Sequence, residues 1–140
     1  MTITVRRVTD LEAALEIRRT VFVEEQGVPA SLEVDGKDDE AVHFIATGDD
    51  EPVGTARLRE PDPGVAKAER VAVLPPRRGE GIGRQLMGAL EDAARERGCD
   101  RVTLHAQTDV EGFYHELGYE TTSDVFEEAG IPHVEMERPL

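Results

Sequence analysis

The chain has 140 residues and is strongly acidic, with 30 Asp and Glu residues against 16 Lys and Arg residues and a net charge of −14 at pH 7. This length suits one hydrophobic core, so we predict a single domain over residues 1–140. Nucleic acid and anionic membranes are disfavoured as partners, because their negative charge repels an acidic protein. No segment approaches the roughly 18 apolar residues of a transmembrane helix, and the single cysteine, Cys99, excludes an internal disulfide. We therefore expect a cytoplasmic protein.

The abundance of acidic residues and the scarcity of lysine resemble the composition of proteins from salt-adapted organisms, with an ordinary acidic cytosolic protein as the alternative. Like charges destabilise a compact chain, and salt screens them because the Debye length falls to about 3 Å at 1 M ionic strength. We therefore predict that the melting temperature rises from dilute buffer towards molar KCl. Thermal unfolding at several KCl concentrations measures this, and a constant melting temperature would contradict the prediction.

Strands and helices alternate along the chain. Strands are predicted over residues 3–8, 42–47, 53–59, 68–74, 102–106, 119–124 and 133–138. A meander of strands followed by a crossover helix produces a mixed sheet with helices on both faces. The sequence therefore predicts an α/β fold without an internal repeat or a domain boundary.

The first helix follows the strand at 3–8. Thr9 and Glu12 have the spacing of a capping box, so we expect the helix to begin there. Its apolar positions predict that Leu11, Leu15 and Phe22 are buried against the sheet. The polar segment that follows, up to residue 40, is expected to lie against the body of the protein with a short helix.

A glycine-rich turn links the central strand, 68–74, to a long amphipathic helix that Gly98 closes. The turn reads Arg-Arg-Gly-Glu-Gly-Ile-Gly-Arg over residues 77–84, a basic island in an acidic chain. Glycines let successive amides approach an anion, and the helix that starts there adds its free amides and dipole. The turn lacks the Lys-Ser/Thr of a Walker loop, and Arg84 replaces the third glycine of a dinucleotide fingerprint. A phosphate-bearing ligand is predicted, with a plain connecting turn as the alternative.

The pattern Arg78-x-x-Gly81-x-Gly83 resembles the acetyl-CoA pyrophosphate loop of the GNAT N-acetyltransferase superfamily. A second motif, Phe-Tyr-His-Glu-Leu-Gly-Tyr over 113–119, resembles the F-Y-x-x-L-G-F/Y signature of that family. The order of elements is similar as well, so the resemblance covers nearly the whole chain. It implies the GNAT fold, a central mixed sheet with helices on both faces. The segments 25–29 and 130–133 resemble a small bacterial and archaeal branch whose acceptor is unsettled.

The resemblance implies acetyl-CoA as cosubstrate, with no metal. In the family the backbone of the central strand pairs with the pantetheine arm and the glycine turn meets the pyrophosphate. Gln107 stands where many members have an Asn that contacts the arm. The implied cofactor-binding residues are Val71, Ala72, Val73, Arg78, Gly79, Glu80, Gly81, Ile82, Gly83, Arg84, Gln107 and Tyr114.

The implied reaction is direct transfer of the acetyl group to the amine of a small molecule or a peptide. The thiolate that leaves needs a proton, and the amine must be neutral to attack. Tyr114 occupies the position of the family's general acid, and its phenol is neutral at pH 7 because the reference pKa is about 10. A tyrosine that only packs against its neighbours is the alternative.

Glu69 is the candidate base, acting through water. Strand alternation places it on one face with Val71 and Val73, where a carboxylate is either paired or functional. An ion pair with Arg57 of the neighbouring strand is an equal alternative. His133 and His43 are further candidates for the base. Three more polar residues that could bind a cationic acceptor are expected to be solvated: Glu25, Gln26 and Asp35.

Two other functions remain compatible with the sequence. A non-catalytic acyl-CoA-binding or sensing module could use the same fold, and it would bind CoA without releasing thiol to an amine. An enzyme of this fold could also transfer a longer acyl chain. The shape of the pocket beyond the thioester would decide which chain length fits. The sequence leaves the acceptor and the oligomeric state open, a homodimer included.

Overall fold

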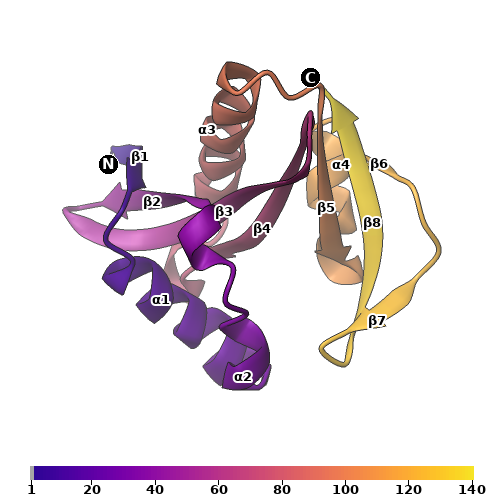
Figure 1. Ribbon diagram of the computed structural model, residues 1–140. Helices are drawn as coiled ribbons and strands as arrows, with labels where there is room; N and C mark the ends of the chain where they lie inside the picture. The colour runs from indigo at the N-terminus through magenta and orange to yellow at the C-terminus, as the bar shows by residue number, and fades with distance from the viewer. Residues whose placement is uncertain (1) are drawn as a thin grey trace.

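The computed structural model describes residues 2–140 and places eight strands in one mixed sheet with helices on both faces (Figure 1). The predicted α/β fold class is confirmed. Within these residues, no helix is long and apolar enough to cross a bilayer.

The strands are β1 (Ile3–Val8), β2 (Val42–Gly48), β3 (Glu51–Asp62), β4 (Val65–Val73), β5 (Arg101–Gln107), β6 (Glu120–Thr121), β7 (Phe126–Glu128) and β8 (Ile131–Pro139). The helices are α1 (Glu12–Arg18), α2 (Ala30–Glu33), α3 (Ile82–Glu96) and α4 (Glu111–Glu116), and a π-helical segment, Arg19–Glu25, continues α1. The sheet order is β1-β2-β3-β4-β5-β8-β6, with β7 paired to β8. Among the described strands, β4 and β5 are the parallel neighbours and every other pair is antiparallel.

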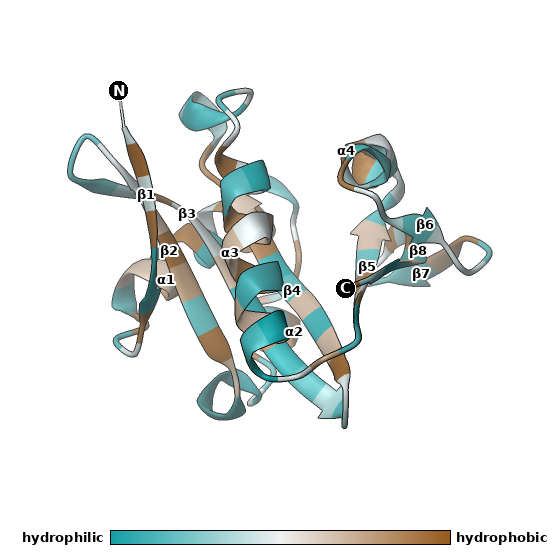
Figure 2. Cartoon of the chain, turned by 90° about the horizontal axis from the view of Figure 1, so that it is seen from above, coloured by the Kyte–Doolittle hydropathy of each residue, from teal (hydrophilic) through white to brown (hydrophobic). Residues whose placement is uncertain are grey.

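Helix α3 packs on one face of the sheet and forms the main core together with the strands. Its buried Leu86, Met87 and Leu90 recur at the spacing predicted from the sequence. Helix α1 lies on the opposite face, where Ile17 and Val21 form a second, smaller core with the sheet. Between the two layers, hydrophobic and hydrophilic residues alternate along the strands (Figure 2).

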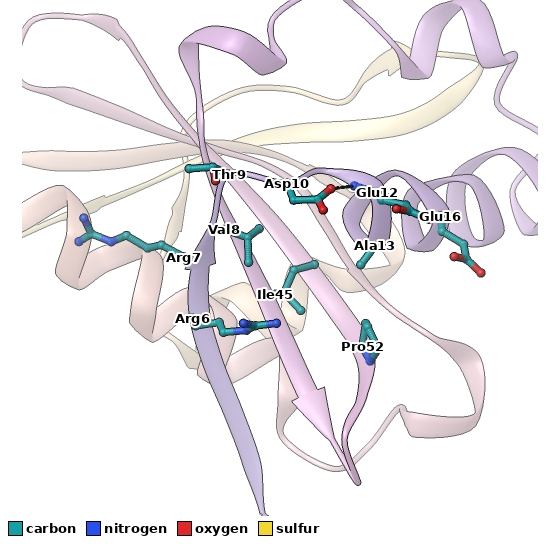
Figure 3. Close-up of a pocket in the computed structure, with 10 residues that line it drawn as sticks. All are labelled: Arg6, Arg7, Val8, Thr9, Asp10, Glu12, Ala13, Glu16, Ile45 and Pro52. Carbon is teal, nitrogen blue, oxygen red and sulfur yellow. Dashed lines mark hydrogen bonds between the residues drawn. The ribbon is translucent and has the colours of Figure 1, made fainter.

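Helix α1 differs from its prediction in its start and in its buried face. The Glu12 N–H donates to Asp10 Oδ1 at 3.0 Å, so an Asp side chain replaces the predicted Thr9 capping box (Figure 3). Leu15 was expected to be buried and is 37% exposed. The buried side chains of α1 and the segment that follows are Ala14, Ile17, Arg18 and Val21.

The end of the chain contains a hairpin that the sequence did not predict. The expected strand at 119–124 is reduced to Glu120–Thr121, and Phe126–Glu128 forms β7 instead. Ala129 and Gly130 both have positive φ angles, of 52° and 76°, which is the geometry of a two-residue turn between β7 and β8. This turn brings β7 back along β8.

Candidate active site

The parallel strands β4 and β5 separate in the middle of the sheet. Their pairing covers Val65–Ala68 and Arg101–Leu104 and ends there, although β4 continues to Val73 and β5 to Gln107. Figure 1 shows the two strands close together at one end and apart at the other. The later part of β4 therefore has backbone groups with no partner strand on its β5 side, as an added extended ligand requires.

A β-bulge in β4 lies where the strands separate. Arg57 pairs with Glu69 and Thr55 pairs with Ala72, so β4 holds one extra residue, and Arg70 has a φ of 55°. The bulge reverses the alternation of side chains. Glu69 consequently shares the α1 face with Ala72, and the prediction that it shares a face with Val71 and Val73 is wrong. Those two valines pack on the α3 side.

The glycine turn leads directly into α3. Gly79 and Gly81 have φ angles of 82° and 83°, and a Cβ at either position would meet no atom within 4 Å. The turn is thus an open cradle of amides at the positive end of a 15-residue helix, which fits a pyrophosphate. Ile82 is 1% exposed, so its side chain belongs to the core and its amide alone faces the turn.

The arginines around the turn are paired with carboxylates. Arg78 donates to both oxygens of Glu25 at 2.7 Å and to the carbonyl of Val73 at 3.0 Å. Arg84 lies 3.9 Å from Glu116. Glu25 is exposed, as expected, and the hydrogen bonds from Arg78 lower its pKa. A phosphate ligand would meet the free amides first, with Arg78 already held beside the turn.

Gln107 stands at the end of β5, where the two strands are apart. Its Nε2 donates to Gln26 Oε1 at 2.8 Å, a contact that links the end of the π-helical segment to β5. Gln26 was expected to be solvated and is instead the partner of Gln107. The two adjacent residues Glu25 and Gln26 therefore contact the glycine turn and β5 respectively.

Tyr114 lies on α4, on the α3 side of the sheet. It is 8% exposed and makes edge-to-face contacts with Phe113 and Tyr119, at centroid distances of 4.9 and 5.8 Å. Its hydroxyl has no hydrogen-bond partner among residues 2–140. Burial raises its pKa, so the phenol holds its proton at neutral pH. The ring is buried, whereas the hydroxyl is not among the buried polar atoms that lack a partner, so it reaches the surface, where a ligand can meet it.

Glu69 forms the ion pair with Arg57 that was predicted as the alternative to a base role. Its carboxylate accepts from Arg59 Nε at 2.6 Å and Arg57 Nη2 at 2.9 Å, with Lys67 Nζ at 3.6 Å. Burial would raise its pKa, but the hydrogen bond from Arg59 and the charges around it lower the pKa to about 2. Glu69 is therefore ionised at neutral pH and is a weak proton acceptor.

The Glu69 pair belongs to a larger network on the α1 face that the sequence did not reveal. Asp35 accepts from Arg57 at 2.8 and 2.9 Å, and Asp38 accepts from Arg57 at 3.0 Å.

The other ion pairs of this network join Arg18 to Glu33 and Asp38, and Arg70 to Glu33 and Asp35. These bonds hold the segment 33–40 against the sheet, and the prediction of a solvated Asp35 is wrong. The one sequence signal was the clustering of acidic residues over 33–40.

This network predicts a loss of stability in acid. The pKa values of Asp35, Asp38 and Glu69 are all lowered in the folded protein, that of Glu69 to about 2, whereas unfolded carboxylates titrate near 4. Their contribution is thus complete above about pH 4.5 and is lost as the pH falls towards 2. Glu69 alone should account for about 2–3 kcal/mol. Urea unfolding at pH 6, 4 and 3 measures this, and an unchanged free energy of unfolding would contradict it.

The remaining histidine candidates lie in different environments. His43 is 4% exposed with Nε2 3.0 Å from the carbonyl of Asp38, so it is a satisfied core residue of the network. His133 lies on β8, opposite Gln107 of β5. A hollow beside β1 and the start of α1 is lined by none of the predicted site residues (Figure 3).

Comparisons with known proteins agree with this geometry. A family model described as an acetyltransferase (GNAT) domain matches residues 7–140. YjcF of Bacillus subtilis, described as an uncharacterised N-acetyltransferase, is 42% identical over 90% of each chain. The crystal structure of an acyl-CoA N-acyltransferase from Pseudomonas aeruginosa is 32% identical, with a TM-score of 0.83 over 98% of each chain. A GNAT family acetyltransferase from Elizabethkingia anophelis, solved with acetyl-CoA bound, shares the fold at 15% identity, with a TM-score of 0.77 over 99% of this chain and 98% of that one.

The family model and the relatives above 30% identity each extend over nearly the whole chain. They confirm the resemblance that the glycine turn and the Phe-Tyr-x-x-Leu-Gly-Tyr motif indicated. The chain therefore belongs to the GNAT family of acetyltransferases.

Proposed function

We propose that this protein transfers the acetyl group of acetyl-CoA to the amine of a small molecule or a peptide. The observation that supports this most is the separation of β4 from β5 beside an open glycine cradle. An extended pantetheine arm and a pyrophosphate need these two features next to each other. The bound thioester would supply an activated acyl group, and the residues of this chain would bind and orient it.

Each part of the donor has a place in this proposal. The backbone of β4 at Val71, Ala72 and Val73 pairs with the arm, and Val71 and Val73 pack beside it from the α3 side. The amides of the turn, residues 79–84, bind the pyrophosphate, and Arg78 adds a positive charge at its edge. Gln107, at the end of β5, contacts the pantetheine arm from the side opposite β4.

Tyr114 is the general acid in the proposed reaction. The phenol is neutral and its ring is buried, and its hydroxyl reaches the surface without a hydrogen-bond partner among residues 2–140, so its proton is available to the sulfur as the C–S bond breaks. Glu69 is less suited to act as the base, because three cations hold its proton affinity low. We assign it a positioning role, in which it fixes the β4 bulge through Arg57 and Arg59.

Thiol release tests the proposed function directly. The protein is incubated with acetyl-CoA and a panel of primary amines, polyamines and peptides at low and high salt, and free CoA thiol is measured. Release that depends on the amine is the expected result. CoA binding by calorimetry without thiol release from any amine would favour a sensing module instead. Parallel assays with butyryl-CoA and decanoyl-CoA decide whether a longer chain is preferred.

A further inference from the structure

A cluster of three ionisable side chains lies on β5, β7 and β8. It is on the same face of the sheet as Glu69 of β4. His133 on β8 is opposite Gln107 on β5, and Glu128 lies on β7, which pairs with β8. His105 on β5 completes the cluster, two residues before Gln107. The buried apolar residues of β5 and β8 belong to the main core on the other face. The cluster therefore borders the place where β5 has left β4, on the side opposite Tyr114.

The contacts of His133 fix where it can take up a proton. Its Nδ1 lies 2.7 Å from the carbonyl of Ile131, and a carbonyl accepts only, so Nδ1 must carry the hydrogen. Neutral His133 then has its lone pair on Nε2, which has no hydrogen-bond partner among residues 2–140. Glu128 Oε2 lies 3.6 Å from Nε2, close enough to pair with it once it is protonated. Both N–H groups of the imidazolium would thus face an acceptor.

Glu128 connects this buried imidazole to solvent. Its Oε1 is 3.0 Å from His105 Nδ1, and His105 Nε2 is 3.9 Å from Glu135. Glu128 is 50% exposed and His105 is 27% exposed, whereas His133 is 9% exposed. Phe126 stacks on His133 and meets His105 edge to face, at centroid distances of 6.1 and 5.1 Å. The ring of Phe126 holds both imidazoles in place.

We propose that His133 is the general base of the acetyl transfer, that Glu128 positions it and passes its proton to solvent, and that His105 holds the Glu128 carboxylate in place. This rests on the proposed function. An alkylammonium acceptor gives one proton to His133 Nε2, its nitrogen then bonds to the acyl carbon, and the C–S bond breaks. Tyr114 protonates the sulfur and recovers its proton from the second N–H of the amine. The products are an N-substituted acetamide, CoA thiol and one proton released through Glu128.

Two amines of matched shape test the assignment. Ethylamine is protonated at pH 7, whereas methoxyamine has the same heavy-atom skeleton and is neutral, so only ethylamine needs a base before attack. His133→Gln should lower kcat/KM for ethylamine by about 10²-fold, the usual scale of general-base catalysis, and change that for methoxyamine much less. Glu128→Gln should show the same selectivity with a smaller loss. Raising the pH until ethylamine is neutral should restore kcat/KM for ethylamine in both the His133→Gln and the Glu128→Gln variant.

Controls and a second measurement separate the possible failures. His115→Gln and Glu127→Gln remove an exposed histidine and an exposed glutamate outside the cluster, and both should keep the parent rates. An equal loss with both amines would overturn the base role while leaving acetyl transfer intact. No thiol release by the parent with any amine would overturn the proposed function itself. Nitrogen NMR of the parent should find the Nδ1–H tautomer of His133, and the Nε2–H tautomer would overturn the proposal whatever the activity.

Discussion

Replacing Tyr114 by Phe is expected to lower kcat by about 10²-fold and to leave the affinity for acetyl-CoA unchanged. The ring and its contacts with Phe113 and Tyr119 stay, and the proton donor alone is lost. The hydroxyl matters mainly as negative charge develops on sulfur, so its removal affects the transition state more than donor binding. Thiol release with the best amine, normalised to the folded fraction, and calorimetry with acetyl-CoA give the two numbers.

Tyr119→Phe is a matched control for this experiment. Tyr119 is also buried, and its hydroxyl donates to Glu91 Oε2 at 2.8 Å, so its role is structural. Losing this hydrogen bond should cost about 1 kcal/mol of stability and leave turnover per folded molecule intact. If Tyr114→Phe behaves in the same way, Tyr114 is not the acid, and water would have to protonate the sulfur.

Replacing Gly81 by Asp is expected to abolish CoA binding. Gly81 is the N-cap of α3, and a Cβ there meets no atom within 4 Å, so an Asp clashes with nothing at Cβ and costs only the backbone strain of a φ of 83°. Its carboxylate would accept hydrogen bonds from the amides that the pyrophosphate needs, and its charge would repel the phosphates. Calorimetry with CoA on the folded variant measures the loss, which should exceed 10²-fold if the cradle supplies the main phosphate contacts.

Gly98→Asp separates backbone strain from cofactor binding. Gly98 lies just beyond the other end of α3, with a φ of 80° and open space around its Cβ, so the same substitution imposes a similar conformational cost. This variant should lose stability and keep its CoA affinity. Equal affinity of the Gly81 variant and the parent would remove the turn from the binding site.

The sequence by itself determined the features that depend on local spacing. The apolar period of α3 and the glycine turn before it both follow from residues close together in the chain. Two motifs in the right order then identified the family and with it the topology of the sheet. The shape of the turn was predictable from its glycines, because glycine readily adopts the positive φ angles found at Gly79 and Gly81, where other residues are strained.

Tertiary structure alone decided the charge environment of the site. One extra residue at Arg70 turned Glu69 to the α1 face, and alternation along a strand cannot show where a bulge falls. Asp35 pairs with an arginine 22 residues away and Glu25 with one 53 residues away, and composition alone could not show either pairing. The meeting of His105, Glu128 and His133 depends likewise on the register of three strands. The reason is physical: local periodicity determines which face a residue occupies only where the helix or strand is regular, whereas bulges, pKa values and hydrogen-bond partners depend on long-range packing.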